Sequence, residues 1–172
     1  NVTNTSTSPR LTTRLASKLG DDVSTDVIYP GRYMATVLPT ETPQYAFADL
    51  AELNKALVSG AIPQGSAIAA GKNFGCGSSR EQAVSTLKGH ELVIIARGFA
   101  RIFLQNSVNL GLRTVVWPDF EGNEGDELEV HADEEVAGGE FLYHLFKGGE
   151  PLSGGDLRRA KRERTATQAE PV

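Results

Sequence analysis

Three apolar runs in the middle of the chain predict buried β-strands. They cover 66–70, 91–96 and 113–117, and each holds at least three apolar residues in succession. Runs of this length without alternation are typical of strands that are covered on both faces of a sheet. Apolar and polar residues instead alternate over 11–18 and over 127–131, which predicts one strand before these three and one after them.

Apolar residues at helical spacing occupy segments before and between these strands. The spacing is clearest over 46–58, 78–88 and 99–110, and glycines at positions 60 and 111 follow two of these segments as predicted stops. The order strand, helix, strand, helix, strand predicts parallel strands in a βαβ-type core. With further strands on either side, the chain is predicted to fold as a mixed α/β or a β/β/α domain.

Length and composition indicate one domain with two tails. The chain has 172 residues, which suits a single domain. Residues 1–10 are polar and aperiodic, which predicts a disordered tail. Residues 151–172 predict a basic C-terminal tail, because 156–164 hold five basic residues in nine. The domain itself is therefore expected to span 11–150.

The charge balance restricts the partners. There are 17 Lys and Arg residues against 22 Asp and Glu residues, so the formal net charge is −5. An acidic chain argues against a nucleic-acid partner. No run approaches the roughly 18 apolar residues of a membrane span, so no membrane partner is expected either. We expect a cytoplasmic protein. The alternative is an organelle, because the first twenty residues contain no acid, as in a transit peptide.

Cysteine and histidine are scarce. Cys76 is the single cysteine of the sequence, and there are three histidines, His90, His131 and His144. One cysteine excludes an internal disulfide and any iron–sulfur or zinc site built from thiolates of this sequence alone. We therefore expect no metal site on this chain.

A glycine-rich turn carries the clearest chemistry. Residues 71–81 read Gly-Lys-Asn-Phe-Gly-Cys-Gly-Ser-Ser-Arg-Glu, after a predicted strand and before a predicted helix. Unpaired N–H groups and the helix dipole at such a position attract anions, and glycines let a ligand approach the backbone. Arg80 adds a charged fork that matches a carboxylate. The residues expected to form this anion-binding turn are Lys72, Asn73, Gly75, Cys76 and Gly77.

Other interpretations of the turn remain open. Ser78 and Glu81 have the spacing of a capping box, in which Ser78 only starts a helix. Cys76 near a helix start has the place of an activated thiol, but no histidine is near it in sequence. The dinucleotide fingerprint fails, because Arg80 stands where it requires glycine. A tight structural turn, a non-catalytic anion-binding module and a phosphate-binding enzyme are the alternatives to an active site.

Three stretches of the sequence resemble one family. Residues 73–81 look like the signature of the swivelling domain of the aconitase superfamily. Residues 20–33, with Thr25-Asp26 and Pro-Gly-Arg-Tyr, resemble that domain's first motif, and 99–112 resemble the helix that follows the signature. The size and the lack of cluster cysteines resemble the separate small subunits of 3-isopropylmalate dehydratase and homoaconitase. The resemblance implies a swivelling three-layer β/β/α domain with a mostly parallel buried core sheet.

The resemblance also implies a reaction. In this family a [4Fe–4S] cluster on a large partner subunit activates a 2-hydroxy acid, so this chain is expected to bind no cofactor itself. Ser78 matches the catalytic base, which acts as an alkoxide and needs strong stabilisation. Ser79 and Arg80 match the residues that hold a substrate carboxylate. The reaction implied is dehydration and rehydration of a dicarboxylic or tricarboxylic hydroxy acid.

The choice of substrate is expected to depend on a loop. In the family it follows the Pro-x-Arg-Tyr motif, and here it offers as substrate-binding residues Arg32, Tyr33, Met34, Ala35 and Thr36. Relatives that take a distal carboxylate often carry an arginine there, whereas Met34 and Ala35 favour an alkyl group, since burying a charge beside them is costly. The resemblance therefore implies isopropylmalate, as for a 3-isopropylmalate dehydratase of leucine biosynthesis, or a close analogue such as a methyl- or benzyl-substituted malate, ahead of homoaconitate. The alternative is that these side chains only pack the loop.

The chain departs from the family pattern at two places. Gln82 stands where the family usually has histidine, so any role of a charged ring is lost at this position. The chain after about residue 135 is also unlike the family's ending.

Overall fold

The computed structural model describes residues 10–136, 140–147, 150–151 and 158–161. Most of the two predicted tails, 1–10 and 151–172, lies outside these residues, so the predicted domain limits stay predictions. The helical elements are α1 (Thr25–Ile28), the 3₁₀ turns Gly31–Tyr33 and Thr42–Tyr45, α2 (Ala51–Ser59), α3 (Glu81–Gly89) and α4 (Arg101–Leu110). None of the helices in the described part of the chain is long and apolar enough to cross a bilayer.

One sheet joins a parallel half to an antiparallel half. The parallel strands are β1 (Arg10–Lys18), β2 (Ala67–Ala70), β3 (Val93–Ala96) and β4 (Arg113–Val116). The antiparallel strands are β5 (Glu127–Val136), β6 (Glu140–Lys147), β7 (Glu150–Pro151) and β8 (Arg158–Lys161). The strand order is β4-β3-β2-β1-β5-β6-β7, and β8 also pairs with β6.

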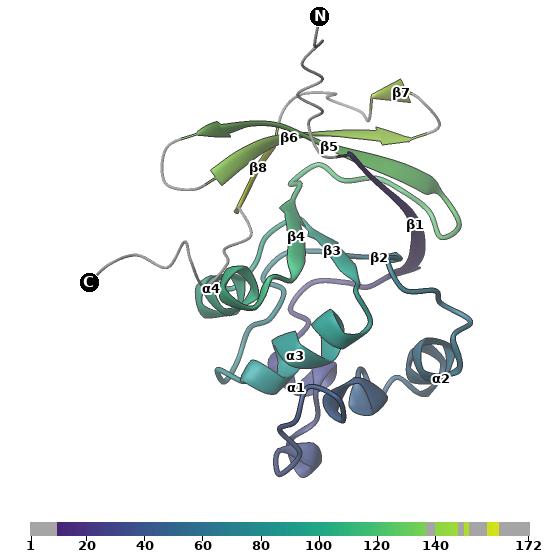
Figure 1. Ribbon diagram of the computed structural model, residues 1–172, viewed down its shortest axis with the longest axis vertical. Helices are drawn as coiled ribbons and strands as arrows, with labels where there is room; N and C mark the ends of the chain where they lie inside the picture. The colour runs from purple at the N-terminus through teal and green to yellow at the C-terminus, as the bar shows by residue number, and fades with distance from the viewer. Residues whose placement is uncertain (1–9, 137–139, 148–149, 152–157, 162–172) are drawn as a thin grey trace, which may run out of the picture.

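The strand β1 connects the two halves because it changes partner along its length. Its residues 10–14 pair antiparallel with β5, and Leu15, Ser17 and Lys18 pair parallel with β2. The register is irregular between Leu15 and Ser17, and such an irregularity bends a strand. Figure 1 shows the antiparallel strands lying over one face of the parallel strands, with the helices on the other side.

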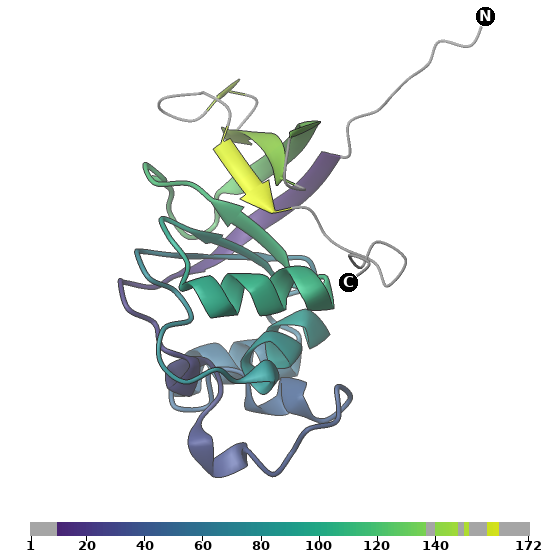
Figure 2. The ribbon, with the colours of Figure 1, turned by 90° about the vertical axis from the view of Figure 1, so that its left-hand side faces the viewer.

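Each face of the parallel sheet buries its own apolar cluster. On β2 and β3, Ala67, Ala69, Val93 and Ile95 pack toward the antiparallel strands, against Leu128 and Val130. The alternate residues Ile68, Ala70, Ile94 and Ala96 pack toward the helices with Leu57, Leu87 and Phe103. The alternation follows from the period of two along a strand. The predicted mostly parallel, buried core sheet within β/β/α layers is confirmed (Figure 2).

The helices begin later than their periodicity predicts. The segment 46–58 is helical only from Ala51, because Phe47 has φ of +52° and donates its N–H to the Ile28 carbonyl at 2.8 Å. The segment 78–88 is helical only from Glu81, since the Ser78 carbonyl accepts the Thr25 hydroxyl at 2.7 Å. The φ of Phe47 is outside the right-handed helical region. The Ser78 carbonyl makes a tertiary bond where a helix starting at Ser78 would require a local one.

The parallel strands fix the position of the site. β1, β2 and β3 are neighbours that run in one direction, so their carboxyl ends lie at one edge of the sheet. The segments that follow them begin at Leu19, Gly71 and Arg97. These segments contain the three stretches that resemble the aconitase superfamily. In parallel sheets, ligands bind outside this edge.

Candidate active site

The turn 71–80 lies between the segment after β1 and the segment after β3. On one side, Gly75 donates its N–H to the Val23 carbonyl at 2.7 Å. On the other side, Phe74 donates to the Gly98 carbonyl at 3.0 Å and accepts from the Ala100 N–H at 2.8 Å. The turn is therefore held by main-chain bonds on both sides.

Two carboxylates hold the first residues of the turn. Asp21 accepts the Lys72 N–H at 2.7 Å, and Asp22 accepts the Asn73 side-chain amide at 3.0 Å. Lys72 and Asn73 are both exposed and do not line the pocket described below. Their predicted part in binding an anion stays a prediction, and the structure gives Asn73 a role in holding the turn.

Gly75 allows α4 to approach the turn closely. Its φ is +86°, and a Cβ atom added there would lie 2.2 Å from Cγ of Phe103. The Phe103 ring is 5.2 Å from the Phe74 ring, centroid to centroid, in an edge-to-face arrangement. Gly77 has φ of +94°, and a Cβ added there would lie at ordinary contact distance, 3.6 Å, from the Thr25 hydroxyl oxygen, so this position needs glycine for its backbone conformation alone.

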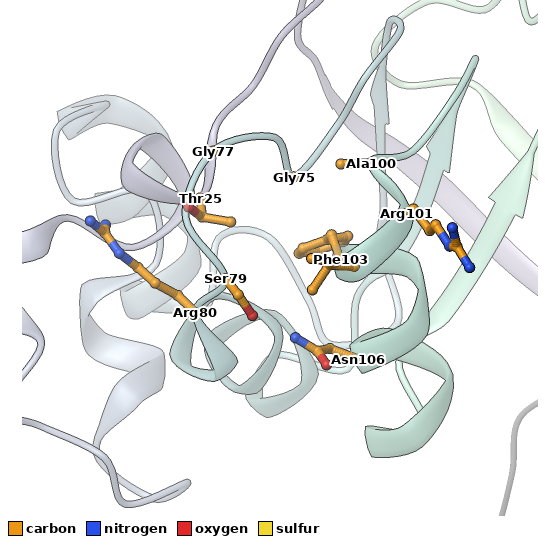
Figure 3. Close-up of a pocket in the computed structure, with 10 residues that line it drawn as sticks. Thr25, Gly75, Gly77, Ser79, Arg80, Ala100, Arg101, Phe103 and Asn106 are labelled. Carbon is orange, nitrogen blue, oxygen red and sulfur yellow. The ribbon is translucent and has the colours of Figure 1, made fainter.

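The turn and α4 enclose a pocket of about 290 Å³ (Figure 3). Figure 3 shows the Ser79 hydroxyl and the Asn106 amide pointing toward the same space, with Phe103 between the turn and the helix. The lining residues come from three elements, namely Thr25, Gly75, Gly77, Ser79, Arg80, Ala100, Arg101, Ile102, Phe103 and Asn106.

Two helices begin at this pocket. Arg80 is the N-cap of α3 and Ala100 the N-cap of α4, and neither makes a side-chain capping bond. The first N–H groups of a helix have no partner within it, and the helix dipole adds partial positive charge. The pocket is therefore suited to a carboxylate or another anion.

Arg80 is held on the side of the pocket away from α4. Its Nη1 donates to the Asp26 carboxylate and to the Tyr29 carbonyl, both at 2.8 Å, and its side chain is 16% exposed. Figure 3 shows the guanidinium turned away from Phe103 and Asn106. The hydrogen bond from Arg80, followed by that from the Gly31 N–H, lowers the pKa of Asp26. Arg80 is thus fixed by an ion pair beside the pocket.

Ser78 stands next to the pocket lining, between Gly77 and Ser79. It is exposed, and its carbonyl accepts the Thr25 hydroxyl. Within the described residues, no hydrogen bond is made by its hydroxyl. The capping-box interpretation is wrong, because α3 begins at Glu81 after an N-cap at Arg80 that has no side-chain capping bond.

Cys76 is a half-buried free thiol whose carbonyl accepts the Thr25 N–H at 2.8 Å. Of the three histidines, only His90 has a described side chain. It caps the C-terminal end of α3, opposite the turn, and its ring nitrogen lies 2.7 Å from the Pro43 carbonyl oxygen. His90 is therefore no base for this thiol. The described residues include no cluster of three or more His, Cys, Asp or Glu side chains arranged to hold a metal ion.

The predicted substrate loop lies beside the turn but not in the pocket. Arg32 pairs with Asp49 at 2.6 Å and lies over the Tyr33 ring at 4.7 Å. The bond to Asp49 is the main cause that raises the pKa of Arg32. Tyr33 stacks on Tyr45 with ring centroids 4.0 Å apart. The part of this loop in substrate binding stays a prediction.

Two side chains bind the loop's main chain. The buried Tyr29 hydroxyl lies 3.2 Å from the Tyr33 carbonyl oxygen and 3.1 Å from that of Thr36, and burial raises the pKa of Tyr29. Gln82 donates its amide to the Met34 carbonyl at 3.1 Å. Ala35 is exposed. Gln82, which departs from the family pattern, thus links α3 to the loop.

Several residues of the pocket were missed as site residues. Thr25 and the beginning of α4 line it, although 99–112 is one of the stretches that carry the family resemblance. The stripe of Phe99, Ile102 and Phe103 indicates a packed helix, and periodicity does not indicate which helix end faces a ligand. Figure 3 shows the Arg101 side chain pointing away from the pocket.

Comparison with known proteins decides the family. Residues 28–119, more than half of the chain, match the aconitase C-terminal domain family. The chain belongs to that family. A methanogen homoaconitase small subunit of Methanocaldococcus jannaschii is 43% identical over 121 residues, which cover 70% of this chain and 69% of that subunit. The 3-isopropylmalate dehydratase small subunit of Methanosarcina mazei is 42% identical over 117 residues, 67% of this chain and 70% of its own length.

A solved structure agrees with the family assignment. The crystal structure of a 3-isopropylmalate dehydratase from Methanocaldococcus jannaschii aligns with a TM-score of 0.64 and 35% identity, over 81% of this chain and 83% of that one. The predicted family and fold are confirmed. The chain is a small subunit of the hydro-lyase type shared by 3-isopropylmalate dehydratase and homoaconitase.

Proposed function

We propose that this chain is the small subunit of a two-subunit hydro-lyase that isomerises 3-isopropylmalate in leucine biosynthesis. Relatives named as 3-isopropylmalate dehydratase small subunits support this substrate. The observation that carries the proposal is the pocket at the beginnings of α3 and α4, beside an exposed serine whose hydroxyl makes no bond within the described residues.

The proposed partner is a large subunit that holds a [4Fe–4S] cluster. Clusters of this kind are held by several cysteine thiolates, whereas this sequence has Cys76 alone. The residues present do not fit a cluster, so the cluster is assigned to the partner.

Ser78 acts as the base in the proposed mechanism. It takes a proton from the carbon next to a substrate carboxylate, a double bond forms, and hydroxide leaves the neighbouring carbon. Water then adds in the reverse sense, so the hydroxyl moves by one carbon. A serine hydroxyl is a weak acid, so its alkoxide needs stabilising donors. The N–H groups of the turn and the beginning of α3 are placed to supply them.

A substrate carboxylate is proposed to bind in the pocket. The Ser79 hydroxyl, the Asn106 amide and the first N–H groups of α4 are its donors. Arg80 lines the pocket with its guanidinium turned away from Asn106, and its Nη1 is engaged with Asp26 and Tyr29. Its proposed contribution to holding the carboxylate is therefore its positive charge and not a direct hydrogen bond.

The alkyl group of the substrate is proposed to lie against the loop after Tyr33. This loop exposes apolar side chains, with Met34 38%, Val37 61% and Leu38 54% exposed. Homoaconitate is the second candidate, because a relative at 43% identity is a homoaconitase small subunit. The two are separated by comparing kcat/KM for both acids on the purified complex. A higher value for homoaconitate would overturn the choice of 3-isopropylmalate.

Replacing Ser78 by alanine tests the base assignment. In the complex with its large subunit, Ser78→Ala is expected to lower kcat by about 10²–10⁴-fold, the usual contribution of a general base. The matched control is Ser59→Ala, because Ser59 is an exposed serine at the end of α2, outside the pocket. Turnover of Ser78→Ala equal to that of Ser59→Ala would remove Ser78 as the base. A non-catalytic anion-binding module would then be the preferred function for this chain.

A further inference from the structure

Thr25 holds the turn at two points. It is the first residue of α1 and is 3% exposed. Its N–H donates to the Cys76 carbonyl at 2.8 Å, and its hydroxyl donates to the Ser78 carbonyl at 2.7 Å. Thr25 also lines the pocket. One buried residue therefore binds the main chain on both sides of Gly77.

These two bonds lie on either side of Gly77, a residue that has no side chain to hold it in place. Gly77 has φ of +94° and no atom within 3.5 Å of the position of a Cβ, so side-chain packing does not hold it. Glycine has more backbone freedom than any other residue. The two bonds from Thr25 fix the peptide group between Cys76 and Gly77 and the one between Ser78 and Ser79, so they hold the main chain on either side of Gly77 and Ser78.

Ser78 depends on this arrangement because its own side chain is not anchored. The residue is exposed, and within the described chain no hydrogen bond is made by its hydroxyl. The backbone of Ser78 therefore sets the place of its Cβ atom and, with it, the few staggered positions that the hydroxyl can take. Reacting atoms must be placed accurately, since an error of about 1 Å costs on the order of 10²-fold in rate.

We propose that Thr25 is a positioning residue for Ser78: its hydroxyl fixes the Ser78 peptide group and thereby aims the Ser78 hydroxyl at the substrate carbon. This inference rests on the proposed function, in which Ser78 is the base. Thr25 acts through the main chain, so its loss should affect turnover more than substrate binding.

The test compares Thr25→Val with Thr25→Ser in the complex of this chain with its large subunit. Valine keeps the shape and the main-chain bond to Cys76 but lacks the hydroxyl donor. We expect Thr25→Val to lower kcat by about tenfold or more, with KM within about twofold of the unchanged chain. Serine keeps the donor, so Thr25→Ser should recover most of the lost kcat.

The chain offers a matched control in Thr13→Val. Thr13 is a buried threonine of β1, 5% exposed, whose hydroxyl donates to the Gly65 carbonyl at 2.6 Å, outside the pocket. Both valine variants lose one buried hydroxyl–carbonyl bond, so their melting temperatures should fall by similar amounts. Only Thr25→Val should lose kcat, because a purely structural role would affect both variants alike.

The outcomes separate this inference from the proposed function. If Ser78→Ala is inactive and Thr25→Val has the same kcat as Thr13→Val, the positioning role of Thr25 is overturned. The assignment of Ser78 as the base then still holds. If Ser78→Ala stays active, the proposed function fails, and this inference fails with it. Should Thr25→Val not fold, Thr25→Ala against Thr25→Ser gives the same comparison. Equal kcat values for that pair would overturn the inference.

Discussion

Gly75 is the residue on which the approach of α4 to the turn depends. Its φ is +86°, and Cγ of Phe103 occupies the place of a side chain. A left-handed conformation costs an ordinary residue about 1–2 kcal/mol, and overpacking costs about 1–3 kcal/mol more. Both costs apply at Gly75, and Phe103 lines the pocket.

Replacing Gly75 by alanine should therefore destabilise the chain by about 2–5 kcal/mol. Gly60 is the matched control, because its φ is also +86° and nothing lies within 4 Å of its Cβ position. Gly60→Ala should cost about 1–2 kcal/mol, from the backbone alone. Urea unfolding of both variants measures the difference. Equal costs would show that Phe103 moves aside freely.

Gln82 is a second residue whose role is local and testable. Its amide donates to the Met34 carbonyl at 3.1 Å. Gln82→Glu replaces this donor by an acceptor, so the loop should open more often. One hydrogen bond contributes about 0.5–1.5 kcal/mol, so amide exchange at Met34 and Thr36 should speed up about 2- to 12-fold. Hydrogen exchange read by NMR measures it.

The control for this change is Gln44→Glu. Gln44 also donates its amide to a carbonyl, that of Glu41, at 3.1 Å. This variant should leave exchange at Met34 and Thr36 unchanged. If both variants speed exchange equally, the effect comes from the added charge and not from the bond to Met34.

At the scale of elements, an ion pair joins α1 to α3. Asp26 lies in α1, and Arg80 is the N-cap of α3. Asp26 also accepts the Gly31 N–H at 2.9 Å, so one carboxylate links α1, α3 and the 3₁₀ turn Gly31–Tyr33 that precedes the predicted substrate loop. Asp26 is well exposed, so the pair is screened by solvent. Its effect should appear in the pH dependence of stability.

The pH dependence has a defined sign. The pKa of Asp26 is lowered below its usual 3.8, mainly by the hydrogen bond from Arg80. The stabilisation is therefore complete above the unfolded pKa and is lost as the pH falls through the lower folded pKa. Urea unfolding between about pH 2.5 and 6 should show a steeper fall below pH 4 for the original chain than for Asp26→Asn.

A double-mutant cycle supplies the control. In an Arg80→Met background the Asp26 carboxylate has lost its main partner, so Asp26→Asn should then change the acid-side slope little. An unchanged effect of Asp26→Asn in that background would assign the pKa shift to another group.

At the scale of the whole molecule, two buried clusters stand on either side of one parallel sheet. The helices cover one side of that sheet (Figure 2), and the pocket lies on this side, lined by the turn and by the beginning of α4. Ile102 is 56% exposed at the pocket although it is apolar. With the base proposed on this chain and the cluster proposed on a partner, we expect activity only from the two chains together.

The proposed complex predicts different iron contents and activities for this chain alone and for the two subunits together. This chain alone should bind no iron and should not turn over 3-isopropylmalate, since one cysteine does not hold a cluster. Anaerobic co-purification with its large subunit should yield an iron-containing complex that is active. Iron and sulfide assays on both preparations measure this. Turnover by the chain alone would contradict the division of roles.

The sequence by itself indicated β1 to β5 and the glycine-rich turn, whereas β6, β7, β8 and the order of the strands in the sheet were not predicted from it. Runs such as 92–96 are apolar throughout, because both faces of the sheet are covered, and this property is visible locally. The turn 71–80 is likewise one continuous stretch, so its glycines and its arginine could be recognised without knowing their neighbours.

Only the tertiary structure decided what surrounds the turn. The bond from Thr25 to Ser78 joins residues 53 apart in sequence, and it moves the start of α3 to Glu81. The ion pair of Arg80 with Asp26 spans 54 residues and turns the guanidinium away from the pocket. Periodicity records which face of an element is apolar, whereas these contacts depend on how separate elements pack, which no local pattern contains.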